Sequence, residues 1–385
     1  MQKLFIFNPD CELAIAAGGK FYTPPSNIVT MIEELAFLPA WMGEEGDYVL
    51  MPRLPDDNFL DSVVRPLSCP VKAITEAKLS TIEKVDVQPW GLSPKMCHWL
   101  AKREWGQEWY PAQKEWYSRK TARSVLLHLA KLLPNIEARI VPRVCYTLEE
   151  LTVYTGKDMW IAKAPWSSSG KGLLVFQSTP TAKECEWMTG VLHRQGYLML
   201  EPLLDKIVDF ALEFQATDKG ICFVGWSLFH TGLHGEYMGN FVGSQDAIVM
   251  QLAKFIDLET LMRLPKVLAF ALETLLPEYR GYLGVDMMIY RDEEGNIKIQ
   301  PCVEINLRYN MGIMALAFSD RYLHPGVCGR FSVHFYPVPG EALQVHLNHL
   351  REHPLIYKDN RILSGYLPLI PITETTKFVA SVCCY

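Results

Sequence analysis

Two stretches of this 385-residue chain combine residue types that could handle phosphate groups and metal ions. The first is WIAKAPWSSSGKG at residues 160–172, where Lys163 ends an apolar run and a loop of small residues follows with a second lysine, Lys171. Backbone N–H groups of small residues can turn toward one point and form a concave anion site. A lysine ammonium is a compact charge that can be aimed at the same point. These residue types favour phosphate binding.

The sequence of this loop also has another interpretation. It is not a Walker A motif, because Pro165 stands where that motif needs glycine and Gly172 where it needs serine or threonine. A Ser/Gly turn with an incidental lysine accounts for the same residues equally well.

The second stretch is a predicted β-hairpin. Residues 281–290 (GYLGVDMMIY) and 297–305 (IKIQPCVEI) are rich in apolar and β-branched side chains, and the intervening DEEGN is a turn signature. We expect two antiparallel strands with a turn centred near Glu294. The position of that turn sets which residues face one another across the pair.

This hairpin would gather acids and an amide on one face. Alternation of side chains along a strand places Glu304 and Asn306 together, and the expected turn sets Asp286 opposite Cys302, diagonal to Glu304. Buried carboxylates without a partner are costly, and carboxylate and amide oxygens suit Mg²⁺, so the hairpin predicts a metal site. Arg308, on the same side, could add positive charge near a reacting phosphate. The alternative is a structural ion pair between Arg308 and one of the acids.

Composition limits the classes of protein to which the chain can belong. With 49% hydrophobic residues and a net charge of -6, it suits two or three packed domains and is not basic enough to favour a nucleic-acid or membrane surface. It has no run of ~18 apolar residues, and its first residues do not resemble a signal peptide. Ten cysteines without zinc-ribbon or disulfide-scaffold spacing indicate reduced thiols. We expect a cytoplasmic protein without nucleic-acid or membrane partners.

Strands that alternate with helices predict an open α/β domain in the first third of the chain. Strands are expected at 3–7, 47–51 and 71–74 and a helix at 26–38, and no GxGxxG marks a dinucleotide fold. Farther on, the patterns predict helices at 118–134 and 181–195, strands at 139–146, 159–164, 173–176, 197–201, 207–214 and 221–229, a glycine-rich loop at 230–246 and helices to about 276. The aromatic-rich stretch 90–116 is expected to pack at a domain junction rather than to stack on a ligand.

Three motifs, in this order, together resemble the ATP-grasp superfamily over about residues 118–335. They are Lys163 with its small-residue loop, Glu201-Pro202-Leu203-Leu204, and Asp286 with Glu304-Ile305-Asn306-Leu307-Arg308. The loop is richer in serine than in most members, and Leu307 stands where many have proline. The resemblance implies two α+β subdomains that clamp ATP, a nucleotide lobe at 118–197 and a metal-binding lobe at 198–335. It also implies a preceding α/β domain at 1–117 and a C-terminal extension, 336–385, packed on the grasp domain.

The resemblance also implies nucleotide contacts for individual residues. Lys163 is expected at the α- and β-phosphates, and the β- and γ-phosphates are expected under Ser167, Ser168, Ser169, Gly170, Lys171 and Gly172. Lys120, with Arg119 as competitor, matches an earlier phosphate-facing lysine of the family. The adenine hinge would consist of Glu201, Pro202, Leu203 and Leu204: the Pro202 C=O could accept from the adenine amino group, and the Leu204 N–H could bond the ring. Asp209 is expected at the ribose.

The metal and the reaction follow from the same resemblance. One or two Mg²⁺ or Mn²⁺ ions would be held by Asp286, Glu304 and Asn306, with Arg308 facing the transferred phosphate. Most members activate a carboxylate as an acyl phosphate, which an amine or similar nucleophile attacks. The chain is therefore expected to be an ATP-dependent carboxylate–amine ligase acting on small molecules such as amino acids or peptides. The alternatives are a small-molecule kinase on the same fold and a non-catalytic nucleotide-binding regulator.

Substrate-facing residues are expected in the glycine-rich loop and after the hairpin. The candidates are His234, Tyr237, Asn240, Asn310 and Arg321. Glycines favour a loop over a helix here, so His230 and His234 are not expected to form a zinc site. The alternative is that the loop only packs on the sheet.

Overall fold

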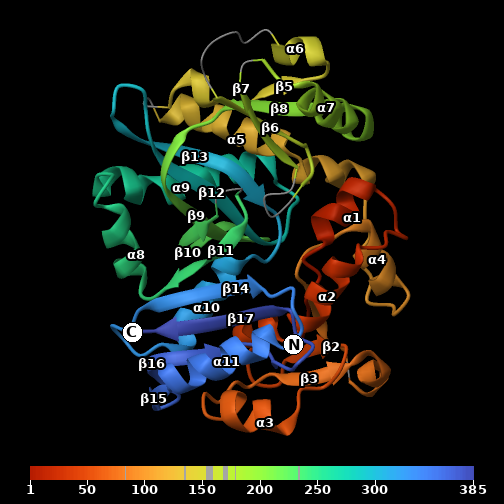
Figure 1. The fold of residues 1–385 in the computed structure, drawn as a ribbon. Coiled ribbons are helices and arrows are strands. Elements are labelled where there is room, and N and C mark those ends of the chain that lie inside the picture. Colours follow the sequence, from red (N-terminus) through yellow and green to blue (C-terminus); the bar gives the residue numbers. More distant parts are fainter. Residues whose placement is uncertain (83, 134–135, 153–158, 168–171, 178, 233–234) are drawn as a thin grey trace.

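A computed structural model describes all residues of the protein except 83, 134–135, 153–158, 168–171, 178 and 233–234, and the described residues form three β-sheets. Two sheets have four strands each, in the orders β3-β2-β1-β4 and β5-β8-β6-β7. The third has nine strands, in the order β13-β12-β9-β10-β11-β14-β17-β16-β15. Figure 1 shows the sheet with β5–β8 at one end of the molecule and the N-terminal strands toward the other.

The N-terminal sheet is parallel, as the α/β prediction requires. Its strands are β1 (Lys3–Ile6), β2 (Tyr48–Met51), β3 (Lys72–Thr75) and β4 (Asp86–Pro89). The associated helices are α1 (Cys11–Ala17), α2 (Ser26–Glu34), the short α3 (Asp57–Phe59) and α4 (Pro94–Ala101). The helix predicted at 26–38 ends at Glu34, and a separate 3₁₀ turn (Leu38–Met42) follows. Pro39 favours this break, because a proline disfavours helical backbone at the residue before it.

The smaller antiparallel sheet consists of β5 (Arg143–Cys145), β6 (Met159–Lys163), β7 (Leu173–Gln177) and β8 (Leu198–Pro202). Its helices are α6 (Leu148–Thr152) and α7 (Ala182–Gln195), and α7 contributes Met188 and Val191 to the core that it shares with this sheet. Because β8 lies between β5 and β6, the lobe limit predicted at residue 197 cuts this sheet. The structural division falls after Pro202.

The nine-stranded sheet runs through most of the rest of the chain. Its strands are β9 (Asp205–Thr217), β10 (Gly220–Thr231), β11 (Tyr237–Val242), β12 (Gly281–Arg291), β13 (Ile297–Asn306), β14 (Gly329–Phe335), β15 (Ile356–Lys358), β16 (Arg361–Pro368) and β17 (Phe378–Cys384). Residues 230–246 were predicted as a loop, but β11 lies within them and pairs with β10 and β14. Three strands of the C-terminal extension prolong the same sheet, so the predicted limit at residue 335 does not separate a distinct layer.

Helices divide the faces of this sheet. α5 (Arg119–Leu132), α8 (Gln245–Leu252) and α9 (Leu258–Leu275) share an apolar core with alternate residues of the sheet such as Phe210, Leu212 and Phe214. The residues between them, Ala211 and Glu213, face a cavity on the other side. This alternation is the ordinary consequence of the pleat, and it leaves one face of β9 free to carry polar groups.

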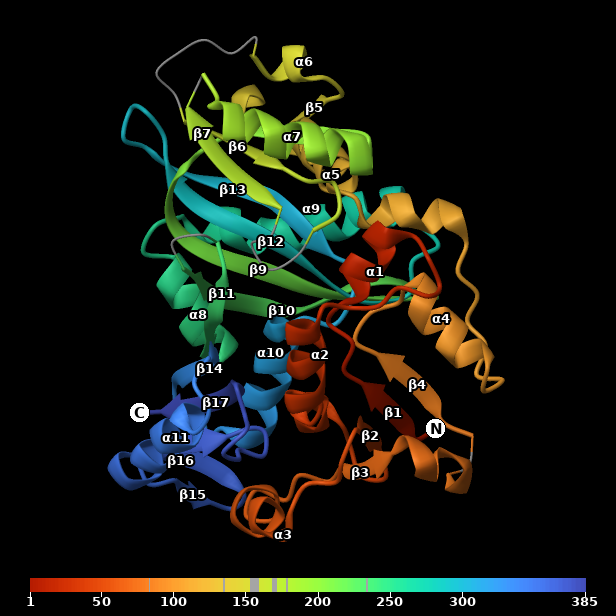
Figure 2. The same cartoon turned by 45° about the vertical axis from the view of Figure 1, so that its right-hand side comes forward.

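The N- and C-terminal segments share one core with α10 (Met311–Tyr322). The Trp41 ring packs edge-on against Phe318 and Tyr322 of α10, and its indole N–H donates to the Leu369 carbonyl at 2.8 Å. α11 (Glu341–Glu352) packs on β16. Figure 2 shows α1 and α2 beside the middle of the large sheet. Within the described parts of the chain, no helix has the length and apolar character needed to cross a bilayer.

Candidate nucleotide and metal site

A buried ion pair lies on the small sheet. Lys163 ends β6 and Glu201 lies on the neighbouring β8, where the register pairs Glu201 with Ile161. This diagonal arrangement brings the Lys163 Nζ to 2.7 Å from the Glu201 Oε2, and the lysine is only 6% exposed. A lysine at this depth carries a positive charge to the sheet surface with one carboxylate as partner. It can exchange that partner for an anionic ligand.

The acid cluster on β12 and β13 differs from the predicted register. Asp286 pairs directly with Glu304, and not with Cys302, because a bulge intervenes. The next registered pair is Met288 with Gln300, so β12 advances by two residues from Asp286 while β13 advances by four from Glu304. Pro301 lies in the longer segment, and proline is confined to bulges and edges because it has no N–H for the ladder. The bulge brings the two carboxylates closer together than predicted.

Asn306 joins this cluster through two hydrogen bonds. Its Nδ2 donates to the Asp286 Oδ2 at 3.0 Å, and its Oδ1 accepts from the Arg308 Nη2 at 2.9 Å. Burial and the nearby charge of Glu304 raise the pKa of Asp286 to about 7. Two adjacent carboxylates and an amide oxygen with a second lone pair are the donor types that Mg²⁺ and Mn²⁺ accept. In the described part of the chain no group of three or more His, Cys, Asp or Glu side chains is arranged for a metal.

Arg119, and not Lys120, lies beside the acids. Its Nη2 is 3.1 Å from the Glu304 Oε1 and 3.3 Å from the Ser167 Oγ, while its Nε donates to the Ala164 carbonyl at 3.1 Å. Lys120 instead places its Nζ 3.7 Å from the centroid of a tyrosine ring, that of Tyr197. Consecutive helix residues point about 100° apart, so Arg119 faces the acid cluster and Lys120 does not; phosphate binding by Lys120 stays a prediction.

The charges of the two sheets converge around Cys302. Burial, with the carboxylates of Asp286, Glu201 and Glu304, raises the pKa of this thiol, and the Lys163 ammonium opposes the shift. Lys163 of β6 and Glu201 of β8 therefore act electrostatically on the same buried thiol as Asp286 of β12 and Glu304 of β13. The Arg119–Glu304 ion pair links the same two regions. Together these groups form a candidate site between the two sheets.

Arg308 has a different partner from either of those predicted. Its Nε and Nη2 lie 3.0 and 3.3 Å from the two carboxylate oxygens of Glu12 in α1. Burial disfavours the guanidinium charge, but Glu12, together with Cys11 and Glu304, opposes this effect and the pKa of Arg308 is raised. The guanidinium is thus held by a bidentate pair with the N-terminal segment, and Arg308 also lines the cavity described below. Glu12 was not identified from the sequence, because its partner is 296 residues away.

The remaining nucleotide candidates lie around β8 and β9. The Leu203 N–H donates to the Met159 carbonyl at 2.9 Å. Asp209 accepts from Lys206 and Thr231, both at 2.6 Å. Gly172 has φ +78°, a conformation that favours glycine. The predicted residues Ser168, Ser169, Gly170 and Lys171, and also His234, lie outside the described residues.

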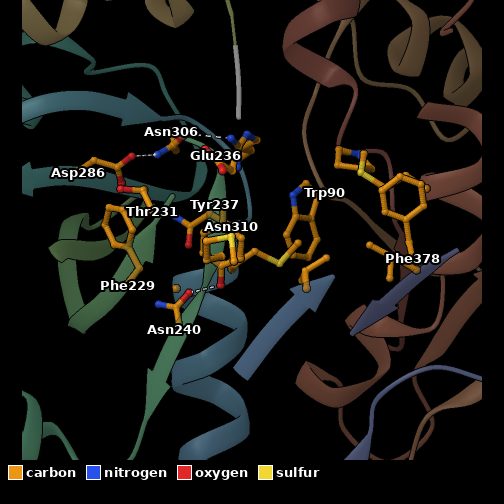
Figure 3. A pocket seen from close by; sticks show the side chains of 18 of the residues that line it. Trp90, Phe229, Thr231, Glu236, Tyr237, Asn240, Asp286, Asn306, Asn310 and Phe378 are labelled. Carbon is orange, nitrogen blue, oxygen red and sulfur yellow. Dashed lines mark hydrogen bonds between the residues drawn. The ribbon is translucent and has the colours of Figure 1, made fainter. Parts of the chain in front are cut away.

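A cavity of about 710 Å³ adjoins the acid cluster. Its walls come from α2, β9–β11, α10, β14 and β17, and its polar end includes Asp286, Glu304, Asn306 and Arg308. Figure 3 shows Asp286 and Asn306 across the cavity from Trp90 and Phe378. The cavity brings the large sheet, the N-terminal segment and the C-terminal strand to one site.

The predicted substrate residues divide between the cavity and the core. Tyr237, Asn240 and Asn310 line the cavity, and Tyr237 donates to Asn240, which donates in turn to the Ser227 Oγ at 2.7 Å. Arg321 is absent from its described lining. It lies in the last turn of α10, about 15 Å along the helix from the residues that reach the cavity. A role for Arg321 in substrate binding therefore has no support from this cavity and stays a prediction.

Glu213 was missed by the sequence analysis. It is 1% exposed on β9, lines the cavity and accepts from the Asn310 Nδ2 at 2.7 Å. Burial is the main cause that raises its pKa to about 8. The available signal was a charge inside the apolar run FALEFQA of a predicted strand, since ionisable residues are seldom fully buried without a partner.

The fold of this chain is similar to those of several solved structures. No protein-family model matches the sequence, and no curated protein matches it significantly. The biotin carboxylase–β,γ-ATP complex of Campylobacter jejuni is similar over 100% of this chain and 87% of its own, with 11% identity and a TM-score of 0.55. The ADP complex of N5-carboxyaminoimidazole synthetase from Staphylococcus aureus is similar over 100% and 93%, with 13% identity and a TM-score of 0.50.

This chain has the ATP-grasp fold. The similarity extends to the biotin carboxylase domain of the Hydrogenobacter thermophilus 2-oxoglutarate carboxylase, which carries MgADP, ADP and bicarbonate, over 99% of this chain and 85% of that chain at 8% identity and a TM-score of 0.52. The ATP-grasp fold, with an α/β domain before it, confirms the predicted fold class.

Proposed function

We propose that the protein is an ATP- and Mg²⁺-dependent ligase that activates a carboxylate as an acyl phosphate for attack by an amine. One observation carries the proposal. Arg119 is paired with Glu304, which lines a cavity of about 710 Å³ together with Asp286 and Asn306, and the buried Lys163 acts with Asp286 and Glu304 on the Cys302 thiol. Positioned charge is the main requirement of phosphoryl transfer.

The nucleotide would lie between the two sheets. Support comes from the fold, since the similar synthetase and carboxylases were solved with ADP, MgADP or an ATP complex. Lys163 would exchange Glu201 for the α- and β-phosphates, and Ser167 and Gly172 would flank the terminal phosphates with the rest of their loop. The Pro202 C=O and the Leu204 N–H would bond adenine, with Asp209 at the ribose.

The metal would be held by Asp286, Glu304 and the Asn306 Oδ1. Bound there, Mg²⁺ would neutralise charge that develops on the transferred phosphoryl group. Arg119 would then leave Glu304 and donate a charge-assisted hydrogen bond to the phosphate, with a length of about 3 Å. Arg308 would act through Asn306, whose amide it orients.

The cavity would hold the reactants away from water. In the proposed reaction a carboxylate oxygen of the substrate attacks the γ-phosphorus of ATP, and ADP leaves. The neutral amine nitrogen then bonds to the acyl carbon, the bond from that carbon to the phosphate oxygen breaks, and inorganic phosphate leaves with the proton that the nitrogen gives up. An acyl phosphate is prone to hydrolysis, so exclusion of water is part of the function. The largely apolar wall opposite the acids supports this role.

Calorimetric titration of Mg·ATP tests the proposal. Wild type should bind saturably, and Lys163→Ala should lose about tenfold or more in affinity, the scale of one charge-assisted contact. The exposed Lys102→Ala is the matched control and should bind like wild type. Release of inorganic phosphate with pooled carboxylates and amines then separates a ligase from a kinase. Absence of nucleotide binding by a folded sample would refute the proposal.

A further inference from the structure

One end of the cavity is apolar and lies away from the proposed nucleotide and metal site. Four aromatic side chains, Phe7, Trp90, Phe335 and Phe378, line it from the N-terminal segment, β14 and β17. Figure 3 shows Trp90 and Phe378 across the cavity from Asn310 and Asn240. Apolar walls with a few placed polar groups are typical of small-molecule sites of this size. This end therefore suits a ligand with an aromatic or aliphatic body.

Glu213 is the buried acid at the polar end of that space. Asn310 is the only hydrogen-bond donor that the described residues bring to its carboxylate. The neighbours of the side chain are small: Gly225 and Gly284 are its partners on the adjacent strands. A Cβ at Gly284 or Gly312 would come closer than 3.0 Å to a Glu213 oxygen. The two glycines therefore leave the space that this carboxylate occupies.

The charges around the cavity favour a cation over an anion. Arg308 is already paired with Glu12, and Asp10 is paired with Lys95. Asp286 and Glu304 form the candidate metal site. Glu213 is left with no cationic partner among the residues that the structure describes, at a depth where an unpaired carboxylate is costly. A carboxylate ligand would add to this cost, and an ammonium group would remove it.

Glu213 is also close to the proposed reaction centre. It is in register with Gly284, which is in register with Asn306, and the next row on the same face is Ala211, Asp286 and Glu304. Rows two residues apart along a strand are separated by about 7 Å. An amine nitrogen bound at Glu213 would therefore lie about one such row from Asp286 and Glu304, the candidate metal ligands.

We propose that Glu213 binds the amine substrate as its ammonium form and accepts one proton from it, which leaves the neutral amine as nucleophile, and that this substrate is a primary amine whose aromatic or aliphatic body fills the cavity between α2 and β17. The role of this amine as a substrate rests on the proposed ligase function. The site itself rests only on the burial, the single donor and the glycine cradle of Glu213.

Three indole compounds of similar shape test it, with binding measured calorimetrically at about pH 8.5, where a carboxylate raised to this degree and an alkylammonium are both charged. Tryptamine is the cation, tryptophol the neutral form and indole-3-acetate the anion. We expect wild type to bind tryptamine most tightly. Glu213→Gln should weaken tryptamine about tenfold or more and change tryptophol by less than about twofold. The exposed Glu33→Gln should bind all three like wild type.

Several results would overturn this inference: tighter binding of indole-3-acetate than of tryptamine, equal tryptamine affinity in wild type and Glu213→Gln, or no binding of any of the three. Gly312→Ala serves as a second variant, because its methyl group would displace the carboxylate while the charge remains. It too should weaken tryptamine selectively. Mg·ATP affinity is measured in the same samples. Glu213-dependent tryptamine binding without Mg·ATP binding supports the amine site and refutes the ligase.

Discussion

Replacement of Glu213 by glutamine should change how the stability of the protein depends on pH. Burial raises the pKa of Glu213 from 4.5 to about 8, with a further increase from Asp286, while the Asn310 hydrogen bond and Arg308 oppose it. Tyr237 also faces it from β11. In the folded protein the proton is therefore held until about pH 8, whereas the unfolded chain releases it near 4.5.

The sign and size follow from this difference. Stability from the bound proton is fully present below pH 4.5 and is lost as pH rises through the folded pKa of about 8. Each pKa unit corresponds to about 1.4 kcal/mol, so wild type should lose about 3 kcal/mol from this one group between about pH 5.5 and pH 8. Glutamine does not titrate, and its carbonyl can still accept from Asn310. The variant should escape this loss.

Urea denaturation of wild type, Glu213→Gln and the exposed control Glu33→Gln provides the assay. Unfolding is followed by tryptophan fluorescence and by circular dichroism, without nucleotide or metal, because coincident transitions are needed for a free energy. The free energy of unfolding of Glu213→Gln, relative to wild type, should rise by about 3 kcal/mol from about pH 5.5 to pH 8. Parallel pH profiles for the two proteins would refute the reasoning, since they would mean that Glu213 is ionised and paired when folded.

Three further predictions concern other contacts of the site. Glu12→Gln should lower the free energy of urea unfolding by about 3–5 kcal/mol, because it leaves Arg308 buried without its counter-charge; a loss below about 1 kcal/mol would contradict this. Arg119→Ala should weaken Mg·ATP about tenfold in calorimetry and Lys120→Ala by less than about twofold, since only Arg119 reaches the acids; equal losses would restore Lys120 as a candidate. Gly284→Ala should lower the urea unfolding free energy by about 1–3 kcal/mol through overpacking, and an unchanged midpoint would show that the cradle can open.

Local pattern was enough to predict the elements and some of the shared faces. Alternation with period two predicted the hairpin strands later observed as β12 and β13 and the common face of Glu304 and Asn306. It also placed Lys163 at the end of a strand. These features depend on the geometry of a few consecutive residues, which the residue types largely decide.

The pairings within the site depended on segments far apart in the chain. The Pro301 bulge moved Asp286 from Cys302 to Glu304, and it could have been suspected from a proline inside a strand, although not its size. The choice of Arg119 over Lys120 depends on the rotation of α5 against the large sheet.

The sequence by itself determined many of the strands and helices up to residue 305, although not β11, and the residue types that could handle phosphate and metal, because backbone geometry and side-chain alternation act over a few residues. Tertiary structure alone decided that Arg308 meets Glu12, that a cavity forms between the N-terminal segment and the last strand, and that Glu213 is buried at its wall. Burial and partner choice arise from packing between segments hundreds of residues apart, and periodicity within one segment carries no record of that packing.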